Sequence, residues 1–319
     1  MSTLQINVPK ALRKIYARIC TALPLEVPEY IQDPDVSSRL IYDRLIADEP
    51  CMIARFGAIE LGVMVNYLGV KRGRRSIWRY IKGKELDWWW NPIPAIHTDF
   101  FPTKTDQRSQ FCEMMENDIP LLDILGSWLP QEQYFEEQLR NCIRVDLELL
   151  NPFFSKEPWT KALEHKKILV VHPFSKSIQS QFKKREFLFS NEDILPEFEL
   201  ITFKPVYGLG KHNNSQFDDW FDALYHMEAE IDKIDYDICL IGCGAYGFPI
   251  AAHVKRMGKK AVHMGGSLQL LFGIRGRRWE NTSYNDQYIY SVLMNRHWVR
   301  PCKEEIPRQA NIIEQGCYW

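Results

Sequence analysis

The sequence lacks several features that would assign it at once to a broad class of proteins. It has no uncharged stretch of about 18 residues, the length that a transmembrane helix needs, and its first residues lack the apolar core of a signal peptide. It also has almost no net charge, since 40 Lys and Arg residues face 41 Asp and Glu residues. We therefore expect a soluble, cytoplasmic protein with no general affinity for nucleic acid.

The signatures of several common catalytic and metal-binding sites are missing as well. The eight cysteines are scattered without a CxxC pair, so the sequence indicates neither a zinc knuckle nor a dithiol redox centre. No GxSxG segment occurs, which disfavours an acyl hydrolase of the common type. We expect the cysteines to be free, mostly buried thiols in a reducing compartment.

What the sequence does contain is an alternation of short apolar runs with amphipathic segments. Runs of strand length lie at residues 51–56, 166–174, 198–205 and 237–241, and a further strand lies in AVHMGG (261–266). Helical spacing occurs at residues 57–69, 217–234 and 247–257, and residues 106–150 look mainly helical. This alternation predicts an α/β fold with a Rossmann-like, mostly parallel sheet, helices on both faces and an additional N-terminal helical segment.

We divide the chain into an N-terminal helical segment (1–37), a catalytic domain (38–300, with halves 38–155 and 160–300) and a tail (301–319). Residues 8–20 have the pattern of a basic amphipathic helix. Packing on the protein's own surface is favoured for this helix, and peripheral contact with a membrane is the alternative. The basic segment 71–84 suits an anionic small ligand, a membrane-proximal acceptor or a solvated helix face better than nucleic acid.

Ligands of parallel sheets bind at the carboxyl ends of the strands, which directs attention to the residues after each strand. The segment GCGAYG (242–247) matches GxGxxG between a strand and a helix, where backbone N–H groups can bind phosphate. The next strand ends at His263 without the acid that holds a dinucleotide ribose, which disfavours a nicotinamide or flavin enzyme. A nucleotide or sugar-phosphate site contacted by Gly242, Gly244 and Tyr246 is favoured, and glycines that serve only packing are the alternative.

Two further turns carry polar groups. His172 follows a strand and could serve as a general base, with Ser175 facing the ligand from the start of the next helix; a structural histidine is the alternative. Arg55, Gly57 and Glu60 surround the end of the first strand. There Arg55 could neutralise phosphate and Glu60 could bind a metal ion or a sugar hydroxyl, whereas an ion pair bracing the turn is the alternative.

The segment HMGGSLQLLFGIRGRRW (263–279) combines glycines with a cluster of arginines. Glycines let a backbone turn tightly or approach a ligand, and guanidinium groups suit phosphates. The segment therefore predicts an anionic, phosphate-bearing ligand. Its candidate contacts are Gly265, Gly266, Gln269, Arg275, Arg277 and Arg278.

RFGAIE (55–60) and the strand-glycine-helix-strand unit that ends in Gly265-Gly266 resemble bacterial GT-D-type glycosyltransferases of surface polysaccharide assembly. The resemblance covers about residues 40 to 280. It implies transfer of a sugar from a nucleotide-diphosphate sugar to a glycan or lipid-linked acceptor. Glu60 corresponds to the second acid of the family's Arg-Phe-Gly-Asp-x-Glu signature, whereas Ala58 replaces the first, so a role for Mn or Mg is left open. Without the ion, the candidates for stabilising the departing diphosphate are Arg55, Arg275, Arg277 and Arg278.

The leading hypothesis is a cytoplasmic or membrane-peripheral glycosyltransferase in which Glu60 or His172 is the base and the arginines balance the diphosphate charge. One alternative is a nucleotide-dependent oxidoreductase or epimerase, which the missing ribose acid disfavours. The other is a non-catalytic nucleotide-sugar-binding or scaffold protein of a polysaccharide complex, which Ala58 makes credible.

Overall fold

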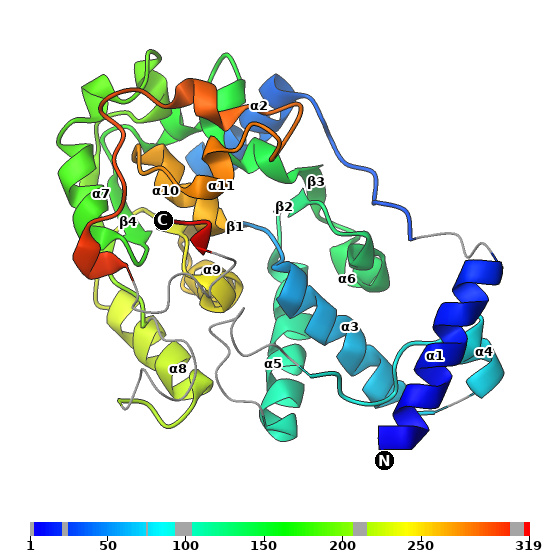
Figure 1. Cartoon of the computed structure of the whole chain (residues 1–319). Helices are drawn as coiled ribbons and strands as arrows, with labels where there is room; N and C mark the ends of the chain where they lie inside the picture. The colour runs from blue at the N-terminus through cyan, green and yellow to red at the C-terminus, as the bar shows by residue number, and fades with distance from the viewer. Residues whose placement is uncertain (1–2, 21–24, 75, 93–103, 207–215, 307–315) are drawn as a thin grey trace.

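A computed structural model describes residues 3–20, 25–74, 76–92, 104–206, 216–306 and 316–319 of the chain (Figure 1). Seven strands form one all-parallel sheet in the order β3-β2-β1-β7-β6-β4-β5. The strands are β1 (Cys51–Ala54), β2 (Ile124–Ser127), β3 (Ile143–Asp146), β4 (Lys167–Val171), β5 (Glu199–Phe203), β6 (Ile238–Ile241) and β7 (Lys260–His263). The predicted α/β fold with a parallel sheet is confirmed.

Helices cover both faces of the sheet, as its apolar strands require. One face packs against α2 (Pro34–Ile46), α7 (Ser175–Phe182), α10 (Leu268–Leu271) and α11 (Arg277–Glu280). The other packs against α3 (Ala58–Arg72), α5 (Thr105–Asp118), α8 (Trp220–Ile231) and α9 (Gly247–Arg256). Side chains along each strand point alternately to the two faces of the sheet, and each face has its own hydrophobic core. Ile53 therefore lies in the core on the first face, and its neighbour Met52 lies in the core on the second. All eight cysteines, which lie within the described residues, are free; four of them are buried.

The remaining helices lie outside these two layers. α1 (Thr3–Ile19) and α4 (Ile77–Ile81) pack against each other at one end of the molecule (Figure 1). α6 (Glu136–Leu139) is a single turn between β2 and β3. In the part of the chain that the structure describes, no helix is both long and apolar enough to cross a membrane. Of the tail, residues 307–315 lie outside the described residues.

One local expectation was wrong and another was incomplete. Residues 106–150 are mainly helical, through α5, α6 and several 3-10 turns, but they also contain the strands β2 and β3, which were not expected. These strands have only four residues each, and β2 ends in Gly126 and Ser127, which have low strand propensity, so the surrounding sheet rather than local pattern determines them. The helix after β1 does not end at Gly69 but at Arg72, followed by Gly73 with φ +69°. Gly69 is required inside the helix because a Cβ there would lie 2.3 Å from the carbonyl oxygen of Asp87.

Candidate functional site

Two pairs of neighbouring strands are followed by helices that cover opposite faces of the sheet. After β1 the chain enters α3, whereas after β7 it enters α10 on the other face. In the same way β6 leads into α9 and β4 into α7. Such switch points are where parallel α/β sheets bind ligands. We call them the β1–β7 and the β4–β6 switch points and compare their side chains.

At the β1–β7 switch point, Arg55 lies directly beside the glycine turn that follows β7. Gly265 has φ +66°, and a Cβ at this position would lie 3.6 Å from Cδ of Arg55. The guanidinium carbon is 5.3 Å from the ring centroid of Trp128, the residue after β2. Burial lowers the pKa of Arg55, yet the side chain still reaches solvent. A cation in this position can bind an anion strongly because little water competes.

Glu60, in the first turn of α3, brings a carboxylate to the same place. The carboxylate folds back over Gly57, where a Cβ would lie 1.7 Å from its Oε2 atom, so only glycine permits this arrangement. Burial raises the pKa of Glu60, and the charge of Arg55 opposes that shift. Arg55 makes no hydrogen bond or ion pair among the described residues. The alternative interpretation, an ion pair that braces the turn, is therefore not seen, and both groups stay available for a ligand.

Side chains from three later segments complete this arrangement. Nη1 of Arg278 lies 3.4 Å from the hydroxyl oxygen of Tyr318, to which it donates, and its guanidinium carbon is 4.9 Å from the ring centroid. The Tyr318 ring covers Gly266, where a Cβ would lie 2.2 Å from Cε1. Glu148, just after β3, accepts hydrogen bonds from the hydroxyls of Tyr284 and Tyr290.

We call six of these residues the carboxyl-edge cluster: Arg55, Glu60, Glu148, Arg278, Tyr284 and Tyr318. The charges of Glu60, Tyr318, Tyr284 and Arg278 all influence the pKa of Arg55, so each of these groups lies within electrostatic range of Arg55. Burial also raises the pKa of Glu148. The cluster thus offers two cations for an anionic group and two carboxylates whose raised pKa values suit a general base.

The β4–β6 switch point is filled by the protein itself. Nδ1 of His172 accepts the backbone N–H of Phe174 at 3.0 Å. A Cβ on Gly242 would lie 2.7 Å from Cδ2 of His172 and 2.6 Å from the carbonyl oxygen of Gly265. Burial lowers the pKa of His172 to about 3, so the ring is neutral and carries its proton on Nε2. This placement favours the structural alternative for His172 and for Gly242.

The start of α7, where Ser175 was expected to face a ligand, already holds a carboxylate. Oε1 of Glu305 accepts the backbone N–H of Lys176 at 2.6 Å, and Oε2 accepts the hydroxyl of Ser177 at 2.5 Å. Free N–H groups at a helix start attract anions, and here an internal anion satisfies them. Ser175 itself is half-buried at the first position of this helix.

Most of the GxGxxG segment is also accounted for by packing. Tyr246 is 1% exposed and stacks on Trp220, with ring centroids 4.8 Å apart. Gly247 lies against the ring of His263, where a Cβ would come within 2.1 Å of Cε1. Gly244 alone is exposed, with φ +61°. The tyrosine therefore cannot reach a ligand from this position without leaving the core.

Only some of the ligand contacts predicted in the segment 263–279 lie at the carboxyl-edge cluster. Gly265, Gly266 and Arg278 join or adjoin the carboxyl-edge cluster, whereas Arg277 is exposed. Nε of Arg275 lies 3.9 Å from the carboxylate of Glu280. Gln269 is 1% exposed and donates to the carbonyl oxygens of Ile274 and Tyr318, both at 3.1 Å, so it holds the C-terminal residues in place.

The residues around Glu60 do not fit a divalent ion held by the protein. Position 58 is an exposed alanine, and the nearest charged group to the carboxylate is the cation Arg55. Hard divalent ions need several oxygen ligands. Within the described residues no group of three His, Cys, Asp or Glu side chains is placed to hold a metal. No step proposed below passes through a metal ion.

The sequence did not indicate Trp128, Glu148, Tyr284 or Tyr318 as site residues. Trp128 directly follows β2 and Glu148 is the second residue after β3, and both strands lie in the region expected to be helical. If the two strands had been recognised, the rule that ligands bind at the carboxyl ends of parallel strands would have indicated these two residues. Tyr318 lies in the tail, for which no local pattern predicted a role.

Comparisons of the chain with protein-family models, with curated proteins and with solved structures found no match. The function is therefore argued from the geometry of the switch points and from the residues that line them.

Proposed function

We propose that this protein is a glycosyltransferase that uses a nucleotide-diphosphate sugar and extends a polysaccharide or lipid-linked acceptor in bacterial surface polysaccharide biosynthesis. One observation carries the proposal: Arg55 at the end of β1 lies beside Gly265 of the β7 turn and within electrostatic range of Glu60 and Arg278. A nucleotide diphosphate needs cations near an approachable backbone, and transfer needs a carboxylate base beside them. The resemblance of RFGAIE (55–60) to the GT-D signature supports the same activity.

In this mechanism the donor diphosphate lies between Arg55 and Arg278. The bond between the sugar's anomeric carbon and the diphosphate oxygen breaks, and the acceptor oxygen forms the new glycosidic bond. Glu60 takes the proton of the acceptor hydroxyl. The two guanidinium groups stabilise the negative charge that develops on the leaving diphosphate, which lowers the barrier because this charge is greatest in the transition state and product.

The proposal is tested by calorimetric titration with UDP-, GDP-, CMP- and dTDP-sugars, comparing two adjacent arginines. Arg278→Ala should weaken binding of the accepted donor by ~1.5–3 kcal/mol, the scale of a charge-assisted hydrogen bond. Arg277→Ala removes an exposed side chain and is the matched control, with unchanged affinity. Equal affinity of both variants and the unaltered protein would contradict a donor site at the carboxyl-edge cluster.

A non-catalytic nucleotide-sugar-binding protein is the second candidate, because Ala58 replaces the first acid of the GT-D signature. Such a protein would bind the donor through Arg55 and Arg278 but release no nucleotide diphosphate when a lipid-linked acceptor is added. A nucleotide-release assay with donor and acceptor together distinguishes the two candidates.

A further inference from the structure

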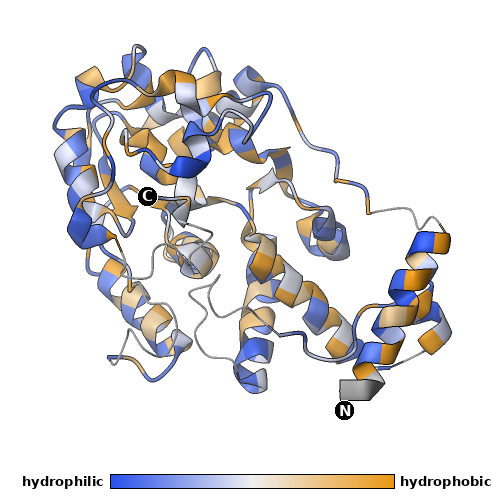
Figure 2. Cartoon of the chain, viewed as in Figure 1, coloured by the Kyte–Doolittle hydropathy of each residue, from blue (hydrophilic) through white to orange (hydrophobic). Residues whose placement is uncertain are grey.

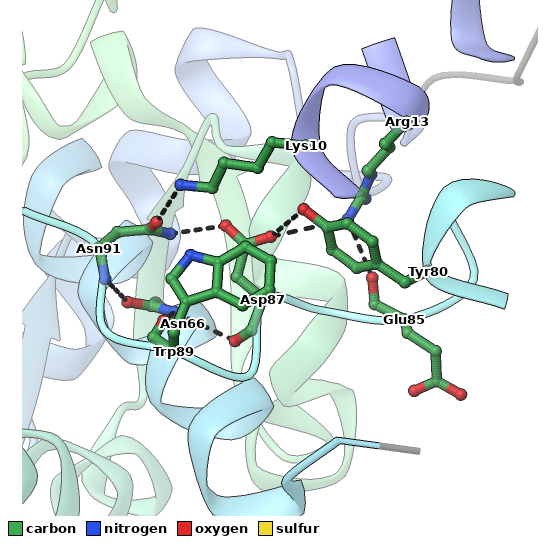
Figure 3. Close-up of polar contacts among 8 residues, drawn as sticks. All are labelled: Lys10, Arg13, Asn66, Tyr80, Glu85, Asp87, Trp89 and Asn91. Carbon is green, nitrogen blue, oxygen red and sulfur yellow. Dashed lines mark hydrogen bonds and ion pairs between the residues drawn. The ribbon is translucent and has the colours of Figure 1, made fainter. Parts of the chain in front are cut away.

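Helix α1 is attached to the rest of the protein through its basic side chains (Figure 3). Nζ of Lys10 donates to Oδ1 of Asn91 at 2.8 Å and lies 5.2 Å from the ring centroid of Trp89. The guanidinium carbon of Arg13 lies 4.7 Å from the ring centroid of Tyr80. The face that α1 turns toward the protein therefore combines these two cations with the buried Pro9 and the half-buried Ile6 and Tyr16.

The surface beneath these cations is a connected polar network. Asp87 accepts the hydroxyl of Tyr80 and the side-chain amide of Asn91, each at 2.7 Å, and lies 3.9 Å from Nη1 of Arg13. Nδ2 of Asn66 donates to the backbone carbonyl of Asp87 at 3.2 Å. Since these partners come from α3, α4 and the segment after α4, the network fixes which side of α1 faces the protein (Figure 3).

The apolar side of α1 consequently faces away from the protein. Val8, Leu12, Ile15 and Ile19 are 52%, 44%, 52% and 76% exposed. Their spacing of four, three and four residues places them in one narrow stripe along the helix. An amphipathic helix of a globular domain ordinarily buries such a stripe against its core, so the orientation of α1 is inverted. Figure 2 shows that hydrophobic and hydrophilic residues alternate along the α1 ribbon. The stripe has no partner among the described residues.

The surroundings of the stripe are aromatic and basic. Trp78 is 74% exposed on α4, the helix that packs against α1. Lys14 and Arg18 are exposed on α1 and lie on one side of the stripe. Further exposed cations follow on α3 and around α4: Lys71, Arg72, Arg74, Lys82 and Lys84. This basic end belongs to a chain whose net charge is only -1.

We propose that α1 lies flat on the surface of an anionic lipid bilayer, with the stripe inserted among the acyl chains and the flanking cations at the lipid phosphates. Apolar insertion combined with electrostatic attraction is how amphipathic helices bind such surfaces, and an exposed tryptophan suits the interface. A second copy of the chain is a poorer occupant, since a two-fold contact through the stripe would bring Lys14 and Arg18 of both copies together. The inference is independent of the proposed enzyme activity.

Co-sedimentation of the full chain with vesicles tests this. Binding to phosphatidylcholine vesicles containing about 30% phosphatidylglycerol should exceed binding to pure phosphatidylcholine at least about tenfold, and should weaken when salt is raised. Equal binding to both vesicle types, or none to either, would overturn the proposal.

The decisive variant is the double substitution Ile15→Ser and Ile19→Ser, which should lower binding to the anionic vesicles about tenfold or more. Val292→Ser is the matched control, because Val292 is 76% exposed like Ile19 but lies in the segment Tyr290–Leu293, which packs on α11. Its binding should not change. Circular dichroism checks that all variants are folded. Loss of a dimer in the double variant, with vesicle binding unaltered, would show that a second copy covers the stripe and would overturn the proposal.

Discussion

The two switch points of the sheet have the same topology but opposite contents. At the β1–β7 switch point the charged groups Arg55 and Glu60 reach solvent without an ion pair to each other in the described structure. At the β4–β6 switch point the neutral ring of His172 packs on Gly242, and Glu305 satisfies the N–H groups at the start of α7. Topology therefore offers two places for a ligand, and side-chain chemistry leaves only one of them open.

This difference shows why glycines alone are weak indicators of a phosphate site. Gly242 is the first residue after β6, and Gly265 is the second residue after the neighbouring strand β7. A Cβ on Gly242 would meet a backbone oxygen at 2.6 Å, whereas one on Gly265 would meet only a flexible arginine at 3.6 Å. Gly242 is therefore packed tightly against its neighbours, whereas Gly265 leaves the guanidinium group of Arg55 accessible.

The largest expected effect separates the two candidate bases. Glu60→Gln should lower kcat by about 10²–10⁴-fold, the usual contribution of general base catalysis, because the amide cannot take a proton. His172→Asn keeps an acceptor for the N–H of Phe174 and should leave kcat nearly unchanged. Steady-state kinetics with the accepted donor measures both. If kcat fell as much in His172→Asn as in Glu60→Gln, the conclusion that the β4–β6 switch point takes no part in the reaction would be wrong.

A smaller effect on stability tests how tightly the β4–β6 switch point is packed. Gly242→Ala should lower the free energy of unfolding by ~1–3 kcal/mol, the cost of overpacking against Gly265 and His172. Gly62→Ala is the control, since a Cβ in that exposed position of α3 would meet nothing within 4 Å. It should stabilise the protein by about 0.5–1 kcal/mol. Urea unfolding measures both, and equal stability of Gly242→Ala and the unaltered protein would mean that the switch point has room.

The last expected effect concerns pH. The pKa of His172 is about 3 in the folded protein and 6.5 as its ordinary value, so between these values the unfolded chain binds more protons. The stabilisation from the neutral ring is therefore present above about pH 6.5 and is lost as the pH falls. His172→Asn removes this linkage, so its free energy of unfolding should fall less steeply with decreasing pH, by up to about 1.4 kcal/mol per unit.

Urea unfolding at several pH values between about 4 and 7 supplies the slopes for that comparison. Identical slopes for His172→Asn and the unaltered protein would mean that the ring binds its proton at the same pH in the folded and the unfolded chain. The ring would then not be kept neutral by burial, and it would become a charged group at low pH.

The sheet could be predicted from sequence wherever its strands are long or almost wholly apolar. β4, β5 and β6 fall within runs such as KKILVV and DICLI, whereas β2 and β3 have four residues each and are specified by their neighbours in the sheet. The fold class was predicted correctly although two strands were missed, because the alternation of strands and helices in the second half already indicates a parallel sheet.

The candidate site was predictable only in part. Arg55 and Glu60 lie five positions apart in one segment, so a local pattern could point to them. Glu148, Tyr284 and Tyr318 come from distant segments, and only the topology of the sheet brings them to the same edge. The pattern GxGxxG misled for Tyr246 because sequence does not distinguish a turn facing a ligand from one packed on Trp220.

The pairing of β1 with β7 also has a consequence for how the chain folds. Cys51 pairs with Lys260, so the centre of the sheet joins residues more than 200 positions apart. Strands β1 to β3 emerge from the ribosome first, and the edge of β1 stays unpaired until β7 has been synthesised. Contacts this distant in sequence slow folding and expose apolar edges to aggregation. Chains truncated before residue 260 should therefore depend on chaperones, whereas the full chain completes its own centre last.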